Sequence, residues 1–169
     1  MNGHNNNQIN IISDEELEYR VGRAVELFKS GFNCSQSVVT AFADIYGFSE
    51  DQALKMAASF GAGIGRMRLT CGAACGMFLL AGLDCGATEG SDRQGKSKNY
   101  AVVQELAQKF ERETGSLTCS KLLGLNKPEG SAEAEKRTPE YYKKRPCSKM
   151  VEVAARIFGS YLKEKINAQ

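Results

Sequence analysis

The sequence predicts an all-α fold: a compact bundle of about six to seven helices with a glycine-rich helix at its centre. Along most of the chain, apolar residues recur at spacings of three and four, the period of an amphipathic helix. Residues that favour helix starts precede these stretches, and glycines follow several of them. No convincing strand alternation and no Asn-Gly or Asp-Gly hairpin between β-branched stretches is present.

Each predicted element follows from these signals. In chain order, the elements are helices from Ser13 to Gly31, Asn33 to Gly47, Ser49 to Gly61, about Cys71 to Leu83 and about Asp92 to Thr114, a short turn from Thr118 to Leu123, a short helix from Thr138 and a last helix from about Cys147. Ser13 with Glu16 reads as a capping box, and Ser49 with Gln52 opens the third helix in the same way. Pro139 occupies the first helical position after Thr138, where its missing N–H costs nothing.

The length of 169 residues predicts one domain. We expect residues 13–166 to form a single all-α four-cysteine domain behind a flexible polar tail at residues 1–12. Residues 124–137 are polar and charged, and they are the best candidate for a disordered loop or a lid.

Composition excludes several classes of function. A net charge of +2 with interleaved signs gives no general field for nucleic acid. The longest apolar stretch is too short to span a bilayer, and the N-terminus does not resemble a secretory signal. The single histidine, His4, disfavours histidine-rich metal sites, and the lack of Cys-x-x-Cys-His excludes c-type haem attachment. We therefore expect a cytoplasmic protein whose six cysteines are reduced.

Four cysteines share a local context. Each falls at a predicted helix start, next to a residue that favours helix entry: Cys34 after Asn33, Cys71 after Thr70, Cys119 after Thr118 and Cys147 after Pro146. Free backbone N–H groups at a helix start favour a thiolate, so we expect these thiols to lose their protons more readily than usual. A buried cysteine that packs only as a small apolar residue is the alternative for each one. The shared context favours a common redox or metal site.

The first turns of the helix that follows Cys71 contain Gly72 and Gly76, and glycine is unfavourable inside a helix. They predict a close approach, either by a bound cofactor or by another helix. Cys75 lies one turn after Cys71 and is a possible additional ligand, whereas Cys85 is expected to be a bystander.

Two further motifs carry weaker signals. The glycines of Gly61-Ala62-Gly63-Ile64-Gly65 do not match a dinucleotide-binding loop. We interpret this segment as a linker, whose following Arg66 and Arg68 could also lie beside a negatively charged metal cluster. The basic and aromatic residues 141–145 are read as a helix surface next to Cys147.

The ordered cysteines resemble a family of proteins described as redox-active and named for the arrangement C…GCAxxG…C…C. Its central motif matches Cys71-Gly72-Ala73-Ala74-Cys75-Gly76, and its other cysteines match Cys34, Cys119 and Cys147. A related module occurs in split-Soret cytochrome c together with haem-binding sequence and a non-haem iron centre; the haem portion has no counterpart here. Cys75 and Cys85 depart from the four-cysteine pattern.

Three hypotheses follow. In the first, Cys34, Cys71, Cys119 and Cys147 bind an iron–sulfur cluster for electron transfer with a redox partner protein. In the second, the cysteines act without metal as redox thiols, with Cys71 and Cys75 or Cys34 and Cys119 as the cycling pair. In the third, the four cysteines hold a structural zinc ion. Whether the protein is an enzyme or an electron carrier stays open, and a homodimer is possible.

Overall fold

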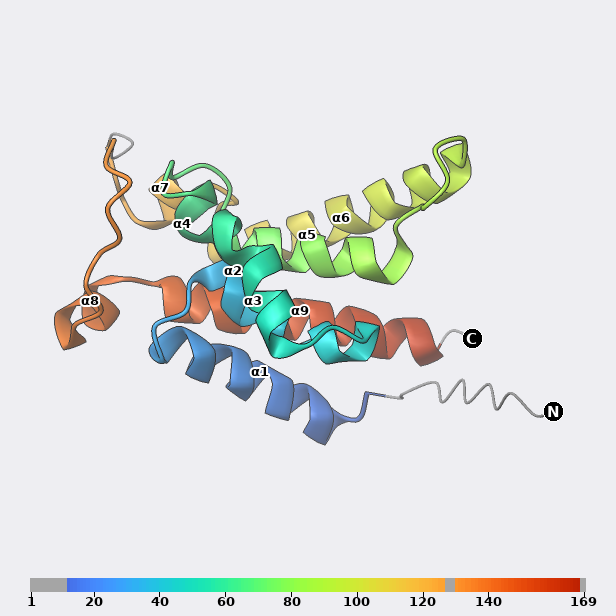
Figure 1. The fold of residues 1–169 in the computed structure, drawn as a ribbon, viewed down its shortest axis with the longest axis horizontal. Coiled ribbons are helices and arrows are strands. Elements are labelled where there is room, and N and C mark those ends of the chain that lie inside the picture. Colours follow the sequence, from blue (N-terminus) through green and yellow to red (C-terminus); the bar gives the residue numbers. More distant parts are fainter. Residues whose placement is uncertain (1–11, 127–129, 168–169) are drawn as a thin grey trace.

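The computed structural model describes residues 12–126 and 130–167, and the predicted all-α fold is confirmed there (Figure 1). The helices are α1 (Asp14–Lys29), α2 (Cys34–Thr40), α3 (Glu50–Ala57), α4 (Gly61–Ile64), α5 (Gly72–Cys85), α6 (Arg93–Thr114), α7 (Cys119–Leu122), α8 (Pro139–Lys144) and α9 (Cys147–Asn167), with 3-10 helices η1 (Ala43–Tyr46) and η2 (Ala58–Phe60). Of the predicted tail, residues 1–11 lie outside the described part, and Ile12 is buried in the core.

Most predicted helix starts form as expected. The side chains of Ser13 and Thr138 accept a hydrogen bond from the third residue after them, and Ser49 forms a reciprocal capping box with Gln52. Only half of the capping box predicted at Ser13 forms. The Ser13 side chain accepts a hydrogen bond from the Glu16 amide, but the Glu16 carboxylate pairs with Arg20 at 2.7 Å. Together these caps anchor the starts of α1, α3 and α8.

The second predicted helix is divided, which the sequence pattern did not indicate. α2 ends at Thr40, and the chain continues as the 3-10 helix η1. The guanidinium of Arg20, from α1, donates to the carbonyl oxygen of Ala41 at 2.7 Å. The amide of Ile45 bonds instead to Phe42 at 3.1 Å, a shorter-range bond than a continuous helix would use. A contact from a neighbouring helix therefore sets this break.

The longest helices form the body of the molecule. α1 and α9 lie side by side in opposite directions, and α5 packs against α2, α6 and α9, the central place predicted for the glycine-rich helix (Figure 1). The core contains the fully buried rings of Phe28, Phe42, Phe110 and Phe158. None of the described helices combines the length and apolar character needed to cross a membrane.

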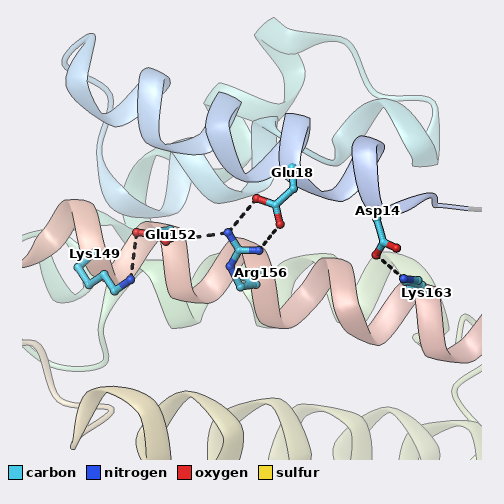
Figure 2. Close-up of polar contacts among 6 residues, drawn as sticks. All are labelled: Asp14, Glu18, Lys149, Glu152, Arg156 and Lys163. Atoms are coloured by element: carbon cyan, nitrogen blue, oxygen red, sulfur yellow. Dashed lines mark hydrogen bonds and ion pairs between the residues drawn. The ribbon is translucent and has the colours of Figure 1, made fainter.

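Ion pairs follow the outer seam between α1 and α9 (Figure 2). Both terminal nitrogens of Arg156 in α9 donate to the carboxylate of Glu18. About two helical turns later in α9, Lys163 pairs with Asp14. These contacts are consistent with the antiparallel register of the two helices, since residues early in α1 meet residues late in α9.

The two ends of the bundle differ in character. At one end, Asp84 of α5 accepts hydrogen bonds from Tyr46 at 3.2 Å and Tyr161 at 2.7 Å, and it pairs with Lys165 at 2.8 Å. At the other end the short helices α4, α7 and α8 gather around the start of α9 (Figure 1). The cysteine site lies at this second end.

Candidate functional site: a four-cysteine cavity

The cysteines predicted at helix starts meet at one cavity. Cys34, Cys71, Cys119 and Cys147 all line a partly open space of about 40 Å³, enough for roughly three water molecules. Cys34 and Cys147 are the first residues of α2 and α9, Cys119 is the first residue of α7, and Cys71 directly precedes α5. Residues distant in sequence thus share one small volume.

Backbone pairing brings Cys71 and Cys119 together. The amide of Cys71 donates to Leu117 at 2.7 Å, and the amide of Cys119 donates to Leu69 at 2.6 Å. Thr70 and Thr118 form an isolated antiparallel bridge at this point. The two segments are fixed against each other at the two cysteines, so both sulfurs are held near the cavity wall.

Cys34 and Cys147 form the second close pair. Asn33 caps α2 through a capping box and also donates from its side chain to the carbonyl of Ala58 at 2.8 Å, which ties the start of α2 to η2. The side chains of Cys34 and Cys147 are hydrogen-bonded to each other. Cys34 is buried, and Cys147 is partly exposed.

Cys147 is the most acidic of these thiols. The hydrogen bond from Cys34 lowers the pKa of Cys147 to about 7, and the positive charges of Arg145, Arg137 and Arg68 act in the same direction against its partial burial. The same hydrogen bond, in which Cys34 keeps its proton, raises the pKa of Cys34 well above the ordinary thiol value. At neutral pH about half of the Cys147 side chains are therefore thiolates, while Cys34 keeps its proton.

The expectation that every helix start would favour a thiolate is wrong for Cys34, Cys71 and Cys119. Burial raises the pKa of Cys71 to about 12, although the backbone N–H groups of Ala74 and Ala73 act to lower it. Burial also raises the pKa of Cys119, against the opposing charge of Arg68. Loss of hydration exceeds the effect of the helix start at these positions.

Three arginines line the same cavity: Arg68, Arg137 and Arg145. The Arg68 side chain is only 5% exposed. Arg137 donates to the carbonyl of Phe32 at 3.2 Å, and its guanidinium lies 4.6 Å from the ring centre of Tyr141. These contacts place fixed positive charge beside the sulfurs, where it favours anionic sulfur.

The segment from residue 130 to residue 138 lies next to this arginine group. The carboxylate of Glu135 pairs with Arg145 at 2.6 Å and lies at 3.9 Å from Arg68 and 4.0 Å from Arg66. The loop predicted at residues 124–137 is thus anchored through Glu135 in its described part, and residues 127–129 lie outside the described residues.

The glycine-rich segment before Cys71 is not a simple linker. Ala62, Ile64, Arg66 and Arg68 have left-handed backbone conformations although they are not glycines. Gly63, also left-handed, lies so close to α7 that an added Cβ would come within 2.6 Å of the Cβ of Cys119. This backbone path lets Ala62, Gly63 and Arg68 line the cavity.

Gly72 and Gly76, in the first turns of α5, have different surroundings. Gly72 lines the cavity, and an added Cβ there would come within 2.9 Å of the backbone carbonyl oxygen of Phe60 and within 3.2 Å of the Cβ of Cys34. Gly76 lies outside the cavity lining, and its Cβ would come within 2.8 Å of the Cβ of Val38 in α2. Of the two close approaches predicted, the one at Gly76 is helix packing.

The remaining cysteines lie outside the cavity lining. Cys75 is buried on a different side of α5, facing an apolar groove. The sulfur of Cys85 lies near the carbonyl of Ala81 at 3.3 Å and accepts a hydrogen bond from Asn99 at 3.5 Å. The structure brings Cys34, Cys71, Cys119 and Cys147 together and leaves these two apart.

The donor chemistry of the cavity fits a thiolate-bound centre, because soft thiolates bind iron–sulfur clusters and zinc and nearby arginines balance their charge. Within residues 12–126 and 130–167, no three histidine, cysteine, aspartate or glutamate side chains are positioned, as they stand, to hold one metal ion. Coordination would therefore require the cysteine side chains to close around the centre.

Sequence reasoning missed part of this site. Tyr141 and Arg145 were assigned to a helix surface, yet both line the cavity, and Arg137 was assigned only to a polar loop. The direct sequence Arg145-Pro146-Cys147 is the one local signal for Arg145, since it places a cation two residues from a cysteine at a helix start. Arg137 has no comparable local signal.

The cysteines and the cavity lie within a segment that matches a known family. A family model described as "Putative redox-active protein (C_GCAxxG_C_C)" matches residues 32–161. Comparison with curated proteins and with solved structures gave no match.

Proposed function

The chain belongs to this redox-active C_GCAxxG_C_C family, and on that premise we propose that the four-cysteine cavity is its redox centre. In this proposal Cys34, Cys71, Cys119 and Cys147 provide thiolates to an iron–sulfur-type centre, which takes up and releases single electrons when bound. The protein passes electrons to or from a redox partner protein in the cytoplasm, where thiols stay reduced.

The observation that carries the proposal is the shared cavity itself: four thiols and three arginines line one small space. A thiolate-bound cluster is anionic, and Arg68, Arg137 and Arg145 would compensate that charge. Cys71 and Cys119 enter from a paired backbone segment, whereas Cys34 and Cys147 enter from helix starts. The centre thus draws on α2, α5, α7 and α9, and we propose residues 13–166 as one domain for this reason.

Within this site, the protein's residues have separate tasks. The low pKa of Cys147, about 7, makes it the first thiolate available at neutral pH. The other three thiols must lose their protons on binding, because burial or the Cys34–Cys147 hydrogen bond raises their pKa values. Metal uptake should therefore release protons and become tighter as the pH rises.

The Cys34–Cys147 hydrogen bond favours a second candidate function, a metal-free dithiol–disulfide couple. The Cys147 thiolate would attack an external disulfide and expel one of its sulfurs as a thiol. The Cys34 thiolate would then attack the mixed disulfide, which gives a Cys34–Cys147 disulfide and a second reduced external thiol. Two electrons pass to the external disulfide, Cys34 supplies one proton as it ionises, and solvent supplies the second proton. This pair differs from both pairs predicted from the sequence.

Anaerobic purification followed by iron, sulfide and zinc analysis separates these functions. The iron–sulfur proposal predicts a brown protein with visible absorption and both iron and acid-labile sulfide. Colourless protein that stays free of iron after anaerobic cluster reconstitution would contradict it. One equivalent of zinc without iron would instead support the structural zinc site. Two thiols that switch with the redox buffer and map to Cys34 and Cys147 would support the dithiol function.

A matched pair of variants tests the ligand assignment. Cys119→Ser removes a cavity thiol and should abolish metal uptake, whereas Cys85→Ser removes a thiol outside the cavity lining and should leave uptake unchanged. Far-UV circular dichroism checks that both variants stay helical. Unchanged uptake by Cys119→Ser, or its loss in Cys85→Ser, would overturn the assignment.

A further inference from the structure

Residues 130–136, called the strap below, lie at the cysteine end of the molecule, shortly before α8 (Figure 1). Every residue of the strap is exposed, so it has no buried apolar side chain to hold it. Its described contacts with the rest of the chain are polar: Arg66 donates to the carbonyl oxygen of Ser131 at 2.7 Å, and Glu135 forms ion pairs. The strap should therefore detach more easily than the packed helices.

The carboxylate of Glu135 lies on an arginine cradle formed by Arg66, Arg68 and Arg145. Arg145 donates to its two oxygens at 2.7 and 2.6 Å, and ion pairs reach Arg68 at 3.9 Å and Arg66 at 4.0 Å. The side chains of Arg68, Arg66 and Arg145 are 5%, 14% and 15% exposed, against 36% for Glu135. The cations are thus largely buried by the fold, whereas the carboxylate comes from a surface segment. The carboxylate is the exchangeable part of this contact.

Two arginines of the cradle also face the sulfurs. Arg68 is hydrogen-bonded to the side chain of Cys119, and the positive charge of Arg145 acts on Cys147, two residues later. Both arginines line the four-cysteine cavity. Arg137 lines it as well, and its Nη1 atom is buried with no hydrogen-bond partner among the described residues. An acceptor atom of a ligand would satisfy this nitrogen.

We propose that Glu135 occupies the position of a ligand carboxylate, and that the ligand is an acidic disulfide, a small molecule whose disulfide bond is accompanied by carboxylates. The ligand would displace Glu135 from Arg145 and Arg68 and release the strap, while one of its sulfurs meets Cys147. A carboxylate is the expected group because the cradle already holds one. The inference rests on the metal-free dithiol function and names its substrate class.

The first chemical step is thiol–disulfide exchange. The Cys147 thiolate attacks one sulfur of the ligand, a sulfur–sulfur bond forms between them, and the disulfide bond of the ligand breaks. The other half of the ligand leaves as a thiolate and takes a proton from solvent. This step needs only Cys147 and the ligand, so it can be measured apart from metal uptake and apart from the later attack by Cys34.

Two disulfides of opposite charge test the ligand class. Glutathione disulfide carries carboxylates, whereas cystamine carries only amines. Site-resolved mass spectrometry of reduced, metal-free protein measures how fast each one forms a mixed disulfide at Cys147. The ratio of the two rates at one pH is independent of the thiolate fraction of Cys147, and the same ratio for mercaptoethanol, a neutral thiol, corrects for intrinsic reactivity. We expect the corrected ratio to favour glutathione disulfide in wild type and to fall when salt is added.

A matched pair of variants tests the role of Glu135. Glu135→Gln removes the competing charge and should raise the preference for glutathione disulfide roughly tenfold, as expected if Glu135 holds the cradle in about nine of ten molecules. Glu133→Gln makes the same change in the same strap, where the carboxylate pairs with no described residue, and should leave the ratio unchanged. Arg145→Gln should lower the ratio. Equal ratios in Glu135→Gln and Glu133→Gln would overturn the proposal, and so would a wild type without preference.

Release of the strap has its own readout. S-methylglutathione carries the carboxylates but cannot exchange disulfides, and it should speed tryptic cleavage after the exposed Lys136 in wild type. Unchanged cleavage would contradict displacement of Glu135. Failure of the dithiol function looks different: the mixed disulfide at Cys147 would form with the expected preference, but no Cys34–Cys147 disulfide would follow.

Discussion

The Cys34 thiol is hydrogen-bonded to the sulfur of Cys147 at the meeting point of the first turns of α2 and α9. This contact makes two chemically identical side chains unequal, because one keeps its proton while the other has a pKa of about 7. Reactivity within the four-cysteine cavity should therefore begin at Cys147.

Removal of the Cys34 donor should raise the pKa of Cys147. In reduced, metal-free protein, Cys34→Ala should slow alkylation of Cys147 at pH 7, by roughly fivefold if the pKa rises by one unit. Because a thiolate forms as pH rises, the alkylation profile should shift toward higher pH. Site-resolved mass spectrometry of iodoacetamide labelling measures this. Cys34→Ser retains a hydroxyl donor and should shift the profile less; equal profiles for wild type and Cys34→Ala would contradict the assignment.

Arg145→Gln tests the contribution of fixed charge. Arg145 lowers the pKa of Cys147, so its removal should raise that pKa and slow labelling of Cys147 at neutral pH. Arg23→Gln is the matched control, because Arg23 pairs with Glu50 at 2.8 Å on the surface of α1. The same labelling assay should leave Arg23→Gln close to wild type. A similar change in both variants would argue against a local effect at the cavity.

Burial of Cys71 predicts a loss of stability at alkaline pH. Its pKa is about 12 in the folded protein against an ordinary value of 9.0, so the unfolded chain loses this proton first. The contribution of Cys71 to the free energy of unfolding is fully present below pH 9 and falls as pH rises toward 12. Between pH 8 and 10 it should decrease by about 1.4 kcal/mol.

Urea unfolding of reduced, metal-free protein measures this decrease. Cys71→Ser removes the titrating group. As pH rises, the free energy of unfolding should therefore fall more for wild type than for Cys71→Ser. Parallel stability curves between pH 8 and 10 would show that Cys71 titrates equally in the folded and unfolded chains.

Gly76→Ala tests whether Gly76 allows the close packing of α5 against α2. The added methyl group would lie 2.8 Å from the Cβ of Val38, and overpacking of this kind costs about 1–3 kcal/mol against a helix-propensity gain of about 1 kcal/mol. We expect net destabilisation. Gly22→Ala has open space and should instead stabilise the protein by about 0.5–1 kcal/mol. Chemical denaturation of both variants checks the difference in sign.

Local sequence signals were sufficient to predict the helix starts and the cysteines at these starts. Ser13, Asn33, Ser49 and Thr138 act through neighbours within three residues, so their roles are readable from the sequence. Thr118 precedes α7 as expected, but its side chain makes no capping bond. Its backbone is used for pairing with Thr70 instead.

Long-range contacts account for what the sequence could not provide. The break after α2 depends on Arg20 reaching Ala41, and the charge at the cavity depends on Arg137 bonding to Phe32. The Cys34–Cys147 pair likewise exists only because α2 and α9 begin at the same place. Each partner is far away in sequence and leaves no periodic signal.

The left-handed residues from Ala62 to Arg68 have an energetic consequence for the cysteine end of the molecule. Each non-glycine residue in this conformation costs roughly 1–2 kcal/mol, a cost that folding of the surrounding segments must offset. If the pairing at Thr70 and Thr118 opened, this backbone could relax to more favourable conformations and recover part of that free energy. Sub-global opening should therefore start here, while the seam between α1 and α9 stays closed. The thiols could then reach solvent, and a centre could be inserted, without unfolding of the whole chain.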